Sequence, residues 1–415
     1  MRASRALAIA GSAAVLTAFG GHLARRVRRA QLSHRMLAVA KDVPLDVLLE
    51  REVGVPVREG NRIELIDNGA VFDALEEQIR AARESIHICE FMWMGEGDPS
   101  ERIGRALLAR RRGVACRVVL DWFGSMRFDR RLEARLVASG VELRRHRPVP
   151  DPFRLNHRRV LVFDGRTALV GGFGIWRSWL GNGAGADEWR DTSARVRGPI
   201  VRDLQRAFDR SWDAAGGRPL PASAYPPPEV AGPDRAAVVA SSPAWARTTL
   251  AARMWYALIA SARRRVYVSN SYFVPDRSLQ DVLIDRARAG VDVRVLAPGS
   301  PHDVPIVHTG QRRTYARLLA GRVRVFEYEA SMMHAKTLVA DDAAVIGSTN
   351  MDSQSLSFLW EASVVALAPA IAEALVGRFL LDLRRSNEIL PAAWARRPLG
   401  VKAVQAAVRV AEPWL

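Results

Sequence analysis

The chain has 415 residues, with an apolar fraction of 49% and a charged fraction of 25%, which are ordinary values for a globular protein. This length can bury a large core and suits two domains or one duplicated domain. The two cysteines, Cys89 and Cys116, exclude a disulfide framework and a cysteine-based zinc site. The net charge of +17 indicates an anionic partner, either an acidic membrane surface or nucleic acid, although a general preference for arginine over lysine explains the charge about equally well.

The N-terminal region, residues 1–45, is predicted to be an apolar segment followed by a basic linker. Residues 6–21 are rich in Ala and Gly, and four arginines follow within residues 25–29. The stretch is marginal for a spanning helix, which needs about 20 apolar residues. A membrane anchor with the arginines on its cytoplasmic side satisfies the positive-inside rule, and an interfacial helix is the alternative.

Residues 46–213 and 236–395 are predicted to be two copies of one α/β unit. The segment ESIHICEFMW in the first pairs with RRVYVSNSYFVPD in the second, and each contains an alternating apolar strand after a basic stretch. Gly113 lies 177 residues before Gly290, and ALVGGFGI pairs with AVIGSTNM at an offset of 176. A repeat this long indicates two supersecondary units rather than an array of small ones.

The segment between the two units, residues 214–235, is rich in proline. Proline fits neither a helix interior nor a central strand, so we expect an extended linker. The tail, residues 396–415, has apolar residues at helical spacing. We expect it either to lie on a membrane or to pack back on the domain.

Each unit carries the same short pattern of a histidine, a cation two residues later and then an aspartate. The members are His157, Arg159 and Asp164 in the first copy and His334, Lys336 and Asp341 in the second. Alternate residues of a strand share a face, so each copy presents an imidazole beside a cation. Two such pairs facing each other can hold a phosphodiester, with one imidazole attacking phosphorus and the other protonating the leaving oxygen.

These motifs, with the segments GGFGI, GSTN, WRDTSARVRGP and SYFVPD, resemble the phospholipase D superfamily, and most closely a bacterial cardiolipin synthase. The resemblance covers roughly residues 45 to 395. It implies an α/β fold in which a phospholipase D-type unit is duplicated, with two mixed β-sheets flanked by helices, a pseudo-twofold relation and one shared active site. It also implies catalysis through a covalent phosphohistidine, without a metal ion or other cofactor.

The resemblance assigns catalytic roles to the histidines and to their cations. We expect His157 to be the nucleophile and His334 the general acid, then the base of the second step. The reverse assignment is the alternative, because Arg159 stands where the family usually has lysine. Arg159 and Lys336 are expected to neutralise the non-bridging phosphate oxygens.

Four acids accompany these groups. Asp164 and Asp341 belong to the catalytic motif by resemblance, but aspartates just past a strand often bond local backbone, and we expect them to hold the scaffold. Glu361, inside the apolar segment SFLWEASVV, and Asp191, in WRDT, are expected to orient the histidines. Glu188 is an alternative to Asp191.

Contacts to phosphate are predicted from the segments that follow each motif. Ser348 and Asn350 alternate along GSTN and can donate hydrogen bonds to phosphate oxygens. Their equivalents in the first unit are Gly172 and Gly174, and the family commonly shows Asn at the latter. The first unit therefore lacks the hydrogen-bond donor expected at position 174. Because it also has Arg159 in place of lysine, it departs further from the family pattern than the second unit does.

Apolar and aromatic loop residues are candidates for contact with lipid. They are Trp176, Trp179, Leu180, Tyr272 and Phe273. The 11 tryptophans of the chain suit a membrane interface, although core packing explains any one of these residues equally well.

We therefore predict a membrane-associated phosphatidyltransferase of the cardiolipin synthase type, at the cytoplasmic side of a bacterial cell membrane. With phosphatidylglycerol as donor and acceptor, the products are cardiolipin and glycerol. The first alternative is a phospholipase D or a phosphodiesterase acting on DNA, but the fused repeat and the apolar N-terminus argue against a nucleic-acid partner. The second is an inactive homologue that binds anionic lipid. The residues predict no oligomeric state.

Overall fold

The computed structural model of the chain describes residues 24–41, 43–95, 97–148, 154–244 and 248–408. The predicted membrane anchor, residues 6–21, lies outside these ranges. Among the described residues, no helix is both long enough and apolar enough to cross a bilayer.

The first half alternates strands and helices. Its elements are β1 (Arg58–Asp67), α3 (Ala70–Ala81), β2 (Ser85–Glu90), α4 (Ser100–Leu108), β3 (Ala115–Asp121), α5 (Arg130–Ala138), β4 (Glu142–His146), β5 (Val160–Phe163), β6 (Thr167–Val170), the 3-10 helix η2 (Arg177–Trp179), β7 (Trp189–Arg190), β8 (Thr192–Arg197) and α6 (Val201–Ala214). Strands β2, β3 and β4 are parallel, and β5 returns antiparallel beside β2.

The second half repeats this succession. Its elements are β9 (Asp234–Ser241), α7 (Leu250–Ser261), β10 (Arg265–Asn270), α8 (Arg277–Arg288), β11 (Asp292–Pro298), α9 (Pro305–Ala320), β12 (Arg324–Tyr328), β13 (Met332–Met333), β14 (Lys336–Ala340), β15 (Ala343–Gly347), β16 (Glu361–Leu367), α10 (Pro369–Leu383), β17 (Ser386–Glu388), α11 (Pro391–Ala395) and α12 (Leu399–Ala407). Strands β10, β11 and β12 are parallel and β14 is antiparallel to β10, as in the first half.

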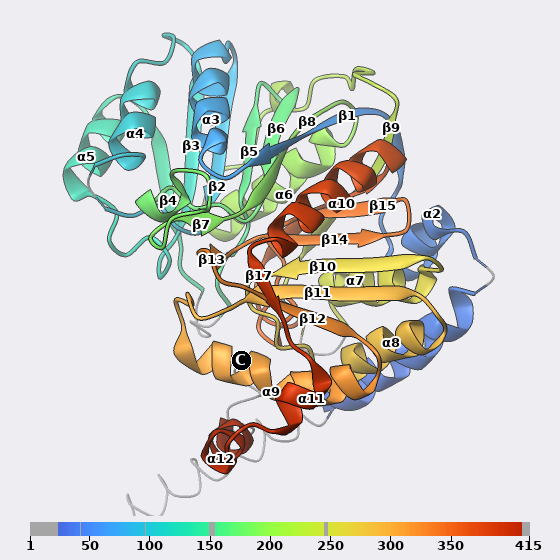
Figure 1. Cartoon of the computed structure of the whole chain (residues 1–415). Helices are drawn as coiled ribbons and strands as arrows, with labels where there is room; N and C mark the ends of the chain where they lie inside the picture. The colour runs from blue at the N-terminus through green and yellow to red at the C-terminus, as the bar shows by residue number, and fades with distance from the viewer. Residues whose placement is uncertain (1–23, 42, 96, 149–153, 245–247, 409–415) are drawn as a thin grey trace, which may run out of the picture.

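The two half-sheets are joined edge to edge into one sheet of 15 strands, with helices on its faces (Figure 1). The joint is the antiparallel pair β1–β9, and strands follow in corresponding order on either side of it: β8, β6, β5, β2, β3, β4 and β16, β15, β14, β10, β11, β12. A second link is the short parallel pair of β7 and β13. The strand order of the second half thus repeats that of the first, and the halves are linked at two places.

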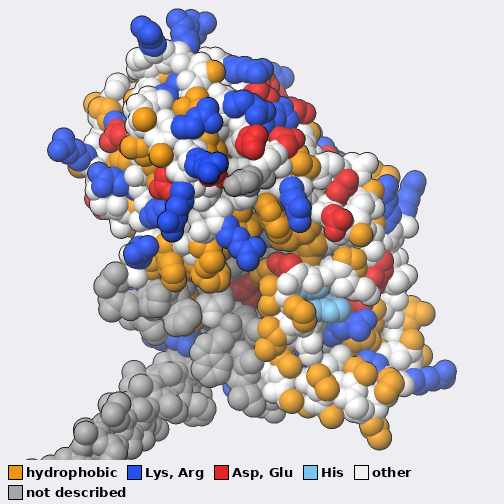
Figure 2. Space-filling view, turned by 90° about the vertical axis from the view of Figure 1, so that its left-hand side faces the viewer, with side chains coloured by type: hydrophobic (Ala, Val, Ile, Leu, Met, Phe, Trp, Pro, Cys, Tyr) orange, Lys and Arg blue, Asp and Glu red, His pale blue; other side chains and the backbone are white. Residues whose placement is uncertain are grey.

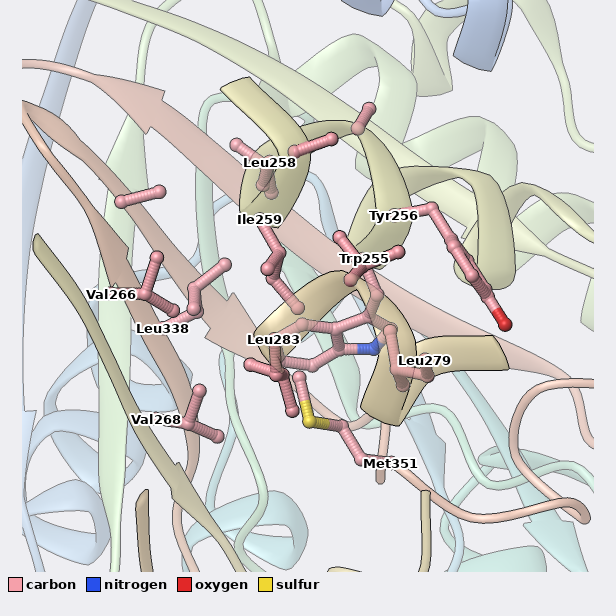
Figure 3. Close-up of a cluster of buried hydrophobic side chains, with 14 of the residues drawn as sticks. Trp255, Tyr256, Leu258, Ile259, Val266, Val268, Leu279, Leu283, Leu338 and Met351 are labelled. Atoms are coloured by element: carbon pink, nitrogen blue, oxygen red, sulfur yellow. The ribbon is translucent and has the colours of Figure 1, made fainter. Parts of the chain in front are cut away.

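Apolar helices cover the strands that lead to the site. In the second half, Trp255 of α7 and Leu283 of α8 pack at the centre of a buried cluster, facing Val268 of β10 and Leu338 of β14 (Figure 3). Helix α7 is apolar along nearly its whole length, so it can be buried on almost every side. A second buried cluster contains residues from strands of both halves, so it packs the two halves against each other.

The region before β1 packs on the second half of the chain. Residues 24–39, expected to be a basic linker, form a helix whose Leu32 and Met36 are buried with the second-half core. These two residues are four apart and therefore share one helix face. Arg29 on the same helix is buried and bonds Asp276. The turn formed by α2 (Leu45–Leu48) and the π-helix η1 (Leu49–Val53) follows.

The proline-rich segment has little regular structure, whereas the described part of the tail is mostly the helix α12. Between α6 and β9 the chain holds a single 3-10 turn, η3 (Ala222–Ala224). In the tail, α12 contacts α9, so the described part of this segment packs on the second half.

Candidate active site

The two motif histidines lie where the halves of the chain meet. His157 comes just before β5 and His334 just before β14. The backbone N–H of His157 donates to the Trp360 carbonyl (2.9 Å), and that of His334 donates to the Arg190 carbonyl (2.7 Å). Each histidine is therefore anchored by backbone of the opposite half.

A buried carboxylate holds each imidazole, and it too comes from the opposite half. His157 Nδ1 lies 2.9 Å from Glu361 Oε1, and His334 Nδ1 lies 3.2 Å from Asp191 Oδ2. When Nδ1 donates its hydrogen to the carboxylate, Nε2 keeps the lone pair that a nucleophile or base requires. The acids are thus exchanged between the halves, and neither half contains a complete site.

The two imidazoles and the two motif cations share one buried site. His157 and His334 are only 6% and 4% exposed. Burial and the charges of Arg159, Lys336 and His334 hold the pKa of His157 well below its usual range. Burial, Lys336 and Arg159 do the same to the pKa of His334. Lys336 of the second half also lies beside Gly172 of the first, where a Cβ would be 3.0 Å from Lys336 Cδ and 2.8 Å from Asp191 Oδ2.

Lys336 contacts His334 directly. Its Nζ donates to Ser271 Oγ (2.8 Å) and to the His334 carbonyl (2.6 Å), and it lies 2.9 and 3.0 Å from the two ring nitrogens. Burial lowers the pKa of Lys336 to about 7, and Asp191 opposes this shift. An anionic ligand would favour the charged ammonium again, because opposite charges stabilise each other.

Arg159 is held by backbone carbonyls instead. Its Nε donates to the Phe173 carbonyl (3.1 Å) and its Nη1 to the His157 carbonyl (2.8 Å). Nε also lies 3.8 Å from Oε1 of Glu90, a buried acid that the sequence did not single out. Burial raises the pKa of Glu90 to about 8, and Arg159 opposes the shift. At the corresponding end of β10 the second half has the neutral Asn270.

A hydroxyl positions Glu361, whereas an indole positions Asp191. Ser348 Oγ donates to Glu361 Oε2. In the first half Gly172 stands in its place, and a Cβ there would lie 2.8 Å from Asp191 Oδ2. Trp179 Nε1 donates to that oxygen instead (2.9 Å). Ser348 is therefore placed to orient Glu361, and its contact with phosphate stays a prediction.

Asn350 reaches the site through Ser271. Ser271 Oγ donates to Asn350 Oδ1 (2.7 Å) and accepts from Lys336. With its oxygen engaged by Ser271, Asn350 could contact a ligand only as a donor, through its amide nitrogen. Its first-half counterpart, Gly174, packs so closely against Trp179 that a Cβ there would lie 3.0 Å from the indole ring.

The motif aspartates do not lie with the histidines. Asp164 and Asp341 each have φ of 53° in the turn that follows their strand. Their carboxylates accept from the backbone N–H groups of residues 83–85 and 263–265, at the starts of β2 and β10. Glu90 lies at the other end of β2, so these contacts are remote from the site. These contacts support the scaffold role that we expected of the two motif aspartates, and not the direct catalytic part that their place in the motif implies.

Two aromatic rings, to which the sequence assigned no role, contact the imidazoles. Trp189 stacks on His334 with ring centroids 4.8 Å apart and planes 22° apart. Phe91 meets His157 nearly edge-on, also at 4.8 Å. Trp189 lies two residues before Asp191, and this spacing was the available signal, since alternate residues of an extended chain share a face.

Two residues considered for lipid contact, Trp179 and Phe273, are fully buried in the core. Trp176 and Leu180, with Trp189, line a cavity of about 470 Å³. Within the described ranges, no group of three or more His, Cys, Asp or Glu side chains is placed to hold a metal ion. The groups that the site does offer are two imidazoles, two cations and an amide, which suit nucleophilic and acid–base chemistry on an anion.

Known proteins resemble both the sequence and the fold. A family model described as cardiolipin synthase, PLD-like domain, matches residues 75–212 and 256–382, which together exceed half of the chain. Cardiolipin synthases of Geobacillus sp. (strain WCH70) and Geobacillus thermodenitrificans (strain NG80-2) are 30% and 31% identical over 90% and 87% of this chain, and over 76% and 74% of their own lengths. The crystal structure of phosphatidylserine synthase from Haemophilus influenzae Rd KW20 shares the fold at 14% identity, with a TM-score of 0.65 over 89% of this chain and 100% of that one. The chain therefore belongs to the cardiolipin synthase family of the phospholipase D superfamily, a family of phosphatidyltransferase enzymes.

Proposed function

We propose that the chain transfers a phosphatidyl group between phospholipids through a covalent phosphohistidine, as a cardiolipin synthase does. The observation that carries this proposal is the exchange of carboxylates between the halves, which orients two imidazoles in one buried site. Identity of 30% or more to cardiolipin synthases over most of the chain supports the same reaction.

The first step forms the phosphohistidine. Nε2 of His157 attacks the phosphorus of the donor lipid, and the bond from phosphorus to the headgroup oxygen breaks. His334 gives its Nε2 proton to that oxygen, so the headgroup leaves as a neutral alcohol. Lys336 and Arg159 neutralise the non-bridging oxygens, on which negative charge persists throughout.

The second step transfers the phosphatidyl group. His334 removes the proton of a second lipid's hydroxyl, whose oxygen attacks phosphorus while the bond to His157 Nε2 breaks. With phosphatidylglycerol as donor and acceptor, the products are cardiolipin and glycerol, and both histidines return to their starting state. Water in place of the second lipid would give phosphatidic acid.

The protonation of His334 is coupled to binding in this scheme. Burial, Lys336 and Arg159 lower the pKa of His334 in the empty site, which disfavours the acid form that the first step needs. A phosphodiester brings a negative charge beside this ring, and an opposite charge favours the protonated form. Binding of the substrate therefore favours the protonated His334 that the first step of its cleavage needs.

An anionic membrane surface is the partner that we propose, at the cytoplasmic side of the cell membrane. The chain carries a net charge of +17. On the face in Figure 2, Lys and Arg side chains are spread over the upper part and hydrophobic side chains gather along the lower part. Each basic residue near an acidic membrane contributes about 1 kcal/mol of attraction.

The test incubates purified protein with phosphatidylglycerol liposomes and follows the products by mass spectrometry. We expect cardiolipin and glycerol in equal amounts from the natural chain and neither from the double variant His157→Ala with His334→Ala. Phosphatidic acid alone would indicate a hydrolase. Liposome binding without product would indicate an inactive lipid-binding homologue, and His334-dependent nicking of supercoiled DNA would favour a nuclease.

A further inference from the structure

Three residues beside Lys336 form a polar cluster that the proposed reaction leaves unused. Tyr272 Oη donates to Asp303 Oδ2 (2.6 Å), and the Tyr272 ring stacks on His302 with centroids 5.9 Å apart and planes 18° apart. Tyr272 directly follows Ser271, whose hydroxyl accepts from Lys336. We call Tyr272, His302 and Asp303 the rim cluster.

The rim cluster lies between the halves, on the same side of the site as His334. The Tyr272 ring packs against the hydrophobic cluster of the first half. That cluster contains Trp179 and Trp189, whose rings contact His334 with centroids 4.9 and 4.8 Å away. The rim cluster therefore borders the reacting groups.

Two polar atoms of the rim cluster are available to a ligand. The Val304 N–H donates to His302 Nδ1 (3.0 Å), and burial lowers the pKa of His302 to about 3, so the neutral ring carries its hydrogen on Nε2. That nitrogen is buried and has no hydrogen-bond partner in the described part of the chain. The Asp303 side chain is 25% exposed, and besides Tyr272 and backbone N–H groups its carboxylate has lone pairs left to accept from a ligand. The rim cluster thus combines an unpaired buried donor with a partly exposed acceptor.

The proposed reaction brings an alcohol to this border. His334 protonates the leaving headgroup and later deprotonates the acceptor hydroxyl, so both alcohols occupy the His334 side of phosphorus. A polyol has further hydroxyl groups beside the reacting one, and each can donate and accept. One such hydroxyl can donate to Asp303 Oδ1 while another accepts from His302 Nε2. An ammonium headgroup fits worse, because Lys336 repels it and it cannot accept from His302.

We propose that the rim cluster is a subsite for the polyol headgroup of the donor and acceptor lipids. Through it, the enzyme prefers glycerol-type acceptors to monohydric alcohols and amino alcohols. This inference rests on the proposed function and on His334 as its acid and base.

The test is a competition between acceptors, using the full chain on phosphatidylglycerol vesicles. Deuterated glycerol, 1-propanol and ethanolamine are supplied at equal concentrations, and mass spectrometry counts the three transfer products. We expect the natural chain to favour deuterated glycerol over 1-propanol by about tenfold or more, and Asp303→Asn to lower that ratio about tenfold. Tyr272→Phe should lower the ratio less, because it frees Asp303 without removing it. Asp342→Asn is the matched control, since this exposed acid pairs with Arg264 beyond the far end of β14.

Two results would overturn the subsite. One is an unchanged glycerol-to-propanol ratio in Asp303→Asn, and the other is an equal loss with both acceptors, which would indicate a structural role. A natural chain that releases headgroup but transfers to no alcohol would instead contradict the transferase function itself, and the subsite with it. The two failures are therefore told apart by the natural chain alone.

Discussion

The two halves hold their histidines with different partners on the same succession of strands. Glu361, which orients His157, takes a hydrogen bond from a serine hydroxyl, while Asp191, which orients His334, takes one from an indole. Glycine at position 172 leaves room for Asp191 and Lys336, since a Cβ there would lie 2.8 Å from Asp191 Oδ2 and 3.0 Å from Lys336 Cδ. Trp179 thus does for Asp191 what Ser348 does for Glu361. The donor that the sequence indicated as missing belongs to another position, Gly174. Each orienting acid requires a hydrogen-bond donor beside it, and either a hydroxyl or an indole N–H can fill that role.

The cations differ in the same way. Lys336 bonds a neutral hydroxyl, whereas Arg159 lies beside the acid Glu90. An adjacent acid offsets part of the positive potential of the guanidinium, so the second half offers phosphate the stronger field when Glu90 is ionised. This asymmetry suits two histidines with unequal tasks, one attacking phosphorus and one exchanging protons.

Removing either histidine should have the largest effect and should separate their roles. On phosphatidylglycerol, His157→Ala and His334→Ala should each lower transfer by about 10⁴-fold or more. A phosphatidyl ester of p-nitrophenol needs no proton at its leaving group, so His334→Ala should still release one equivalent of p-nitrophenol and accumulate phosphohistidine. His157→Ala should release none. Stopped-flow absorbance measures the burst, and a burst from His157→Ala alone would reverse the assignment.

Changing the exchanged acids to amides should have the next largest effect. In Glu361→Gln the amide can donate to His157 Nδ1, which moves the ring hydrogen to Nε2 and removes the lone pair that attacks. We expect about a 10³-fold loss of the burst rate. Asp191→Asn should leave the burst and slow the second step. The control is Glu373→Gln, an exposed acid paired with Arg265, which should retain the full rate. Equal effects of both amides on the burst would contradict the division of roles.

The cations should differ in their response to pH. Because kcat/KM reports the free enzyme and burial lowers the pKa of Lys336 to about 7, Lys336 is charged below that pH and loses its charge above it. The value of kcat/KM should therefore fall about tenfold per unit as pH rises beyond this pKa. In Lys336→Arg the guanidinium stays charged, so the fall of kcat/KM should begin at higher pH. In Arg159→Lys it should begin at the same pH as in the natural chain. An identical alkaline fall in Lys336→Arg would assign it to another group.

Local patterns in the sequence predicted the duplicated α/β order, both histidines and both orienting acids. They could not predict the exchange of those acids, since His157 and Glu361 are 204 residues apart and meet only when the halves dock. The helix over residues 24–39 was missed for a related reason. Its arginines indicated a linker, but Arg29 is buried because Asp276, far along the chain, pairs with it. Side chains whose roles depend on distant partners leave little local signal.

The smallest expected effect comes from the indole itself. Trp179→Phe removes the hydrogen bond to Asp191 but keeps most of the ring, and should lower kcat about fivefold, equivalent to about 1 kcal/mol. Gly172→Ser alone should also lose activity, because its Cβ would lie 2.8 Å from Asp191 Oδ2. Combined with Trp179→Phe, however, the smaller ring leaves Asp191 room to shift away from the new Cβ. The new hydroxyl can then donate to Asp191 Oδ2 as Ser348 does to Glu361, and we expect part of the activity to return. A double variant worse than both single ones, at unchanged thermal stability, would mean that Trp179 fills space at this position and does not orient Asp191.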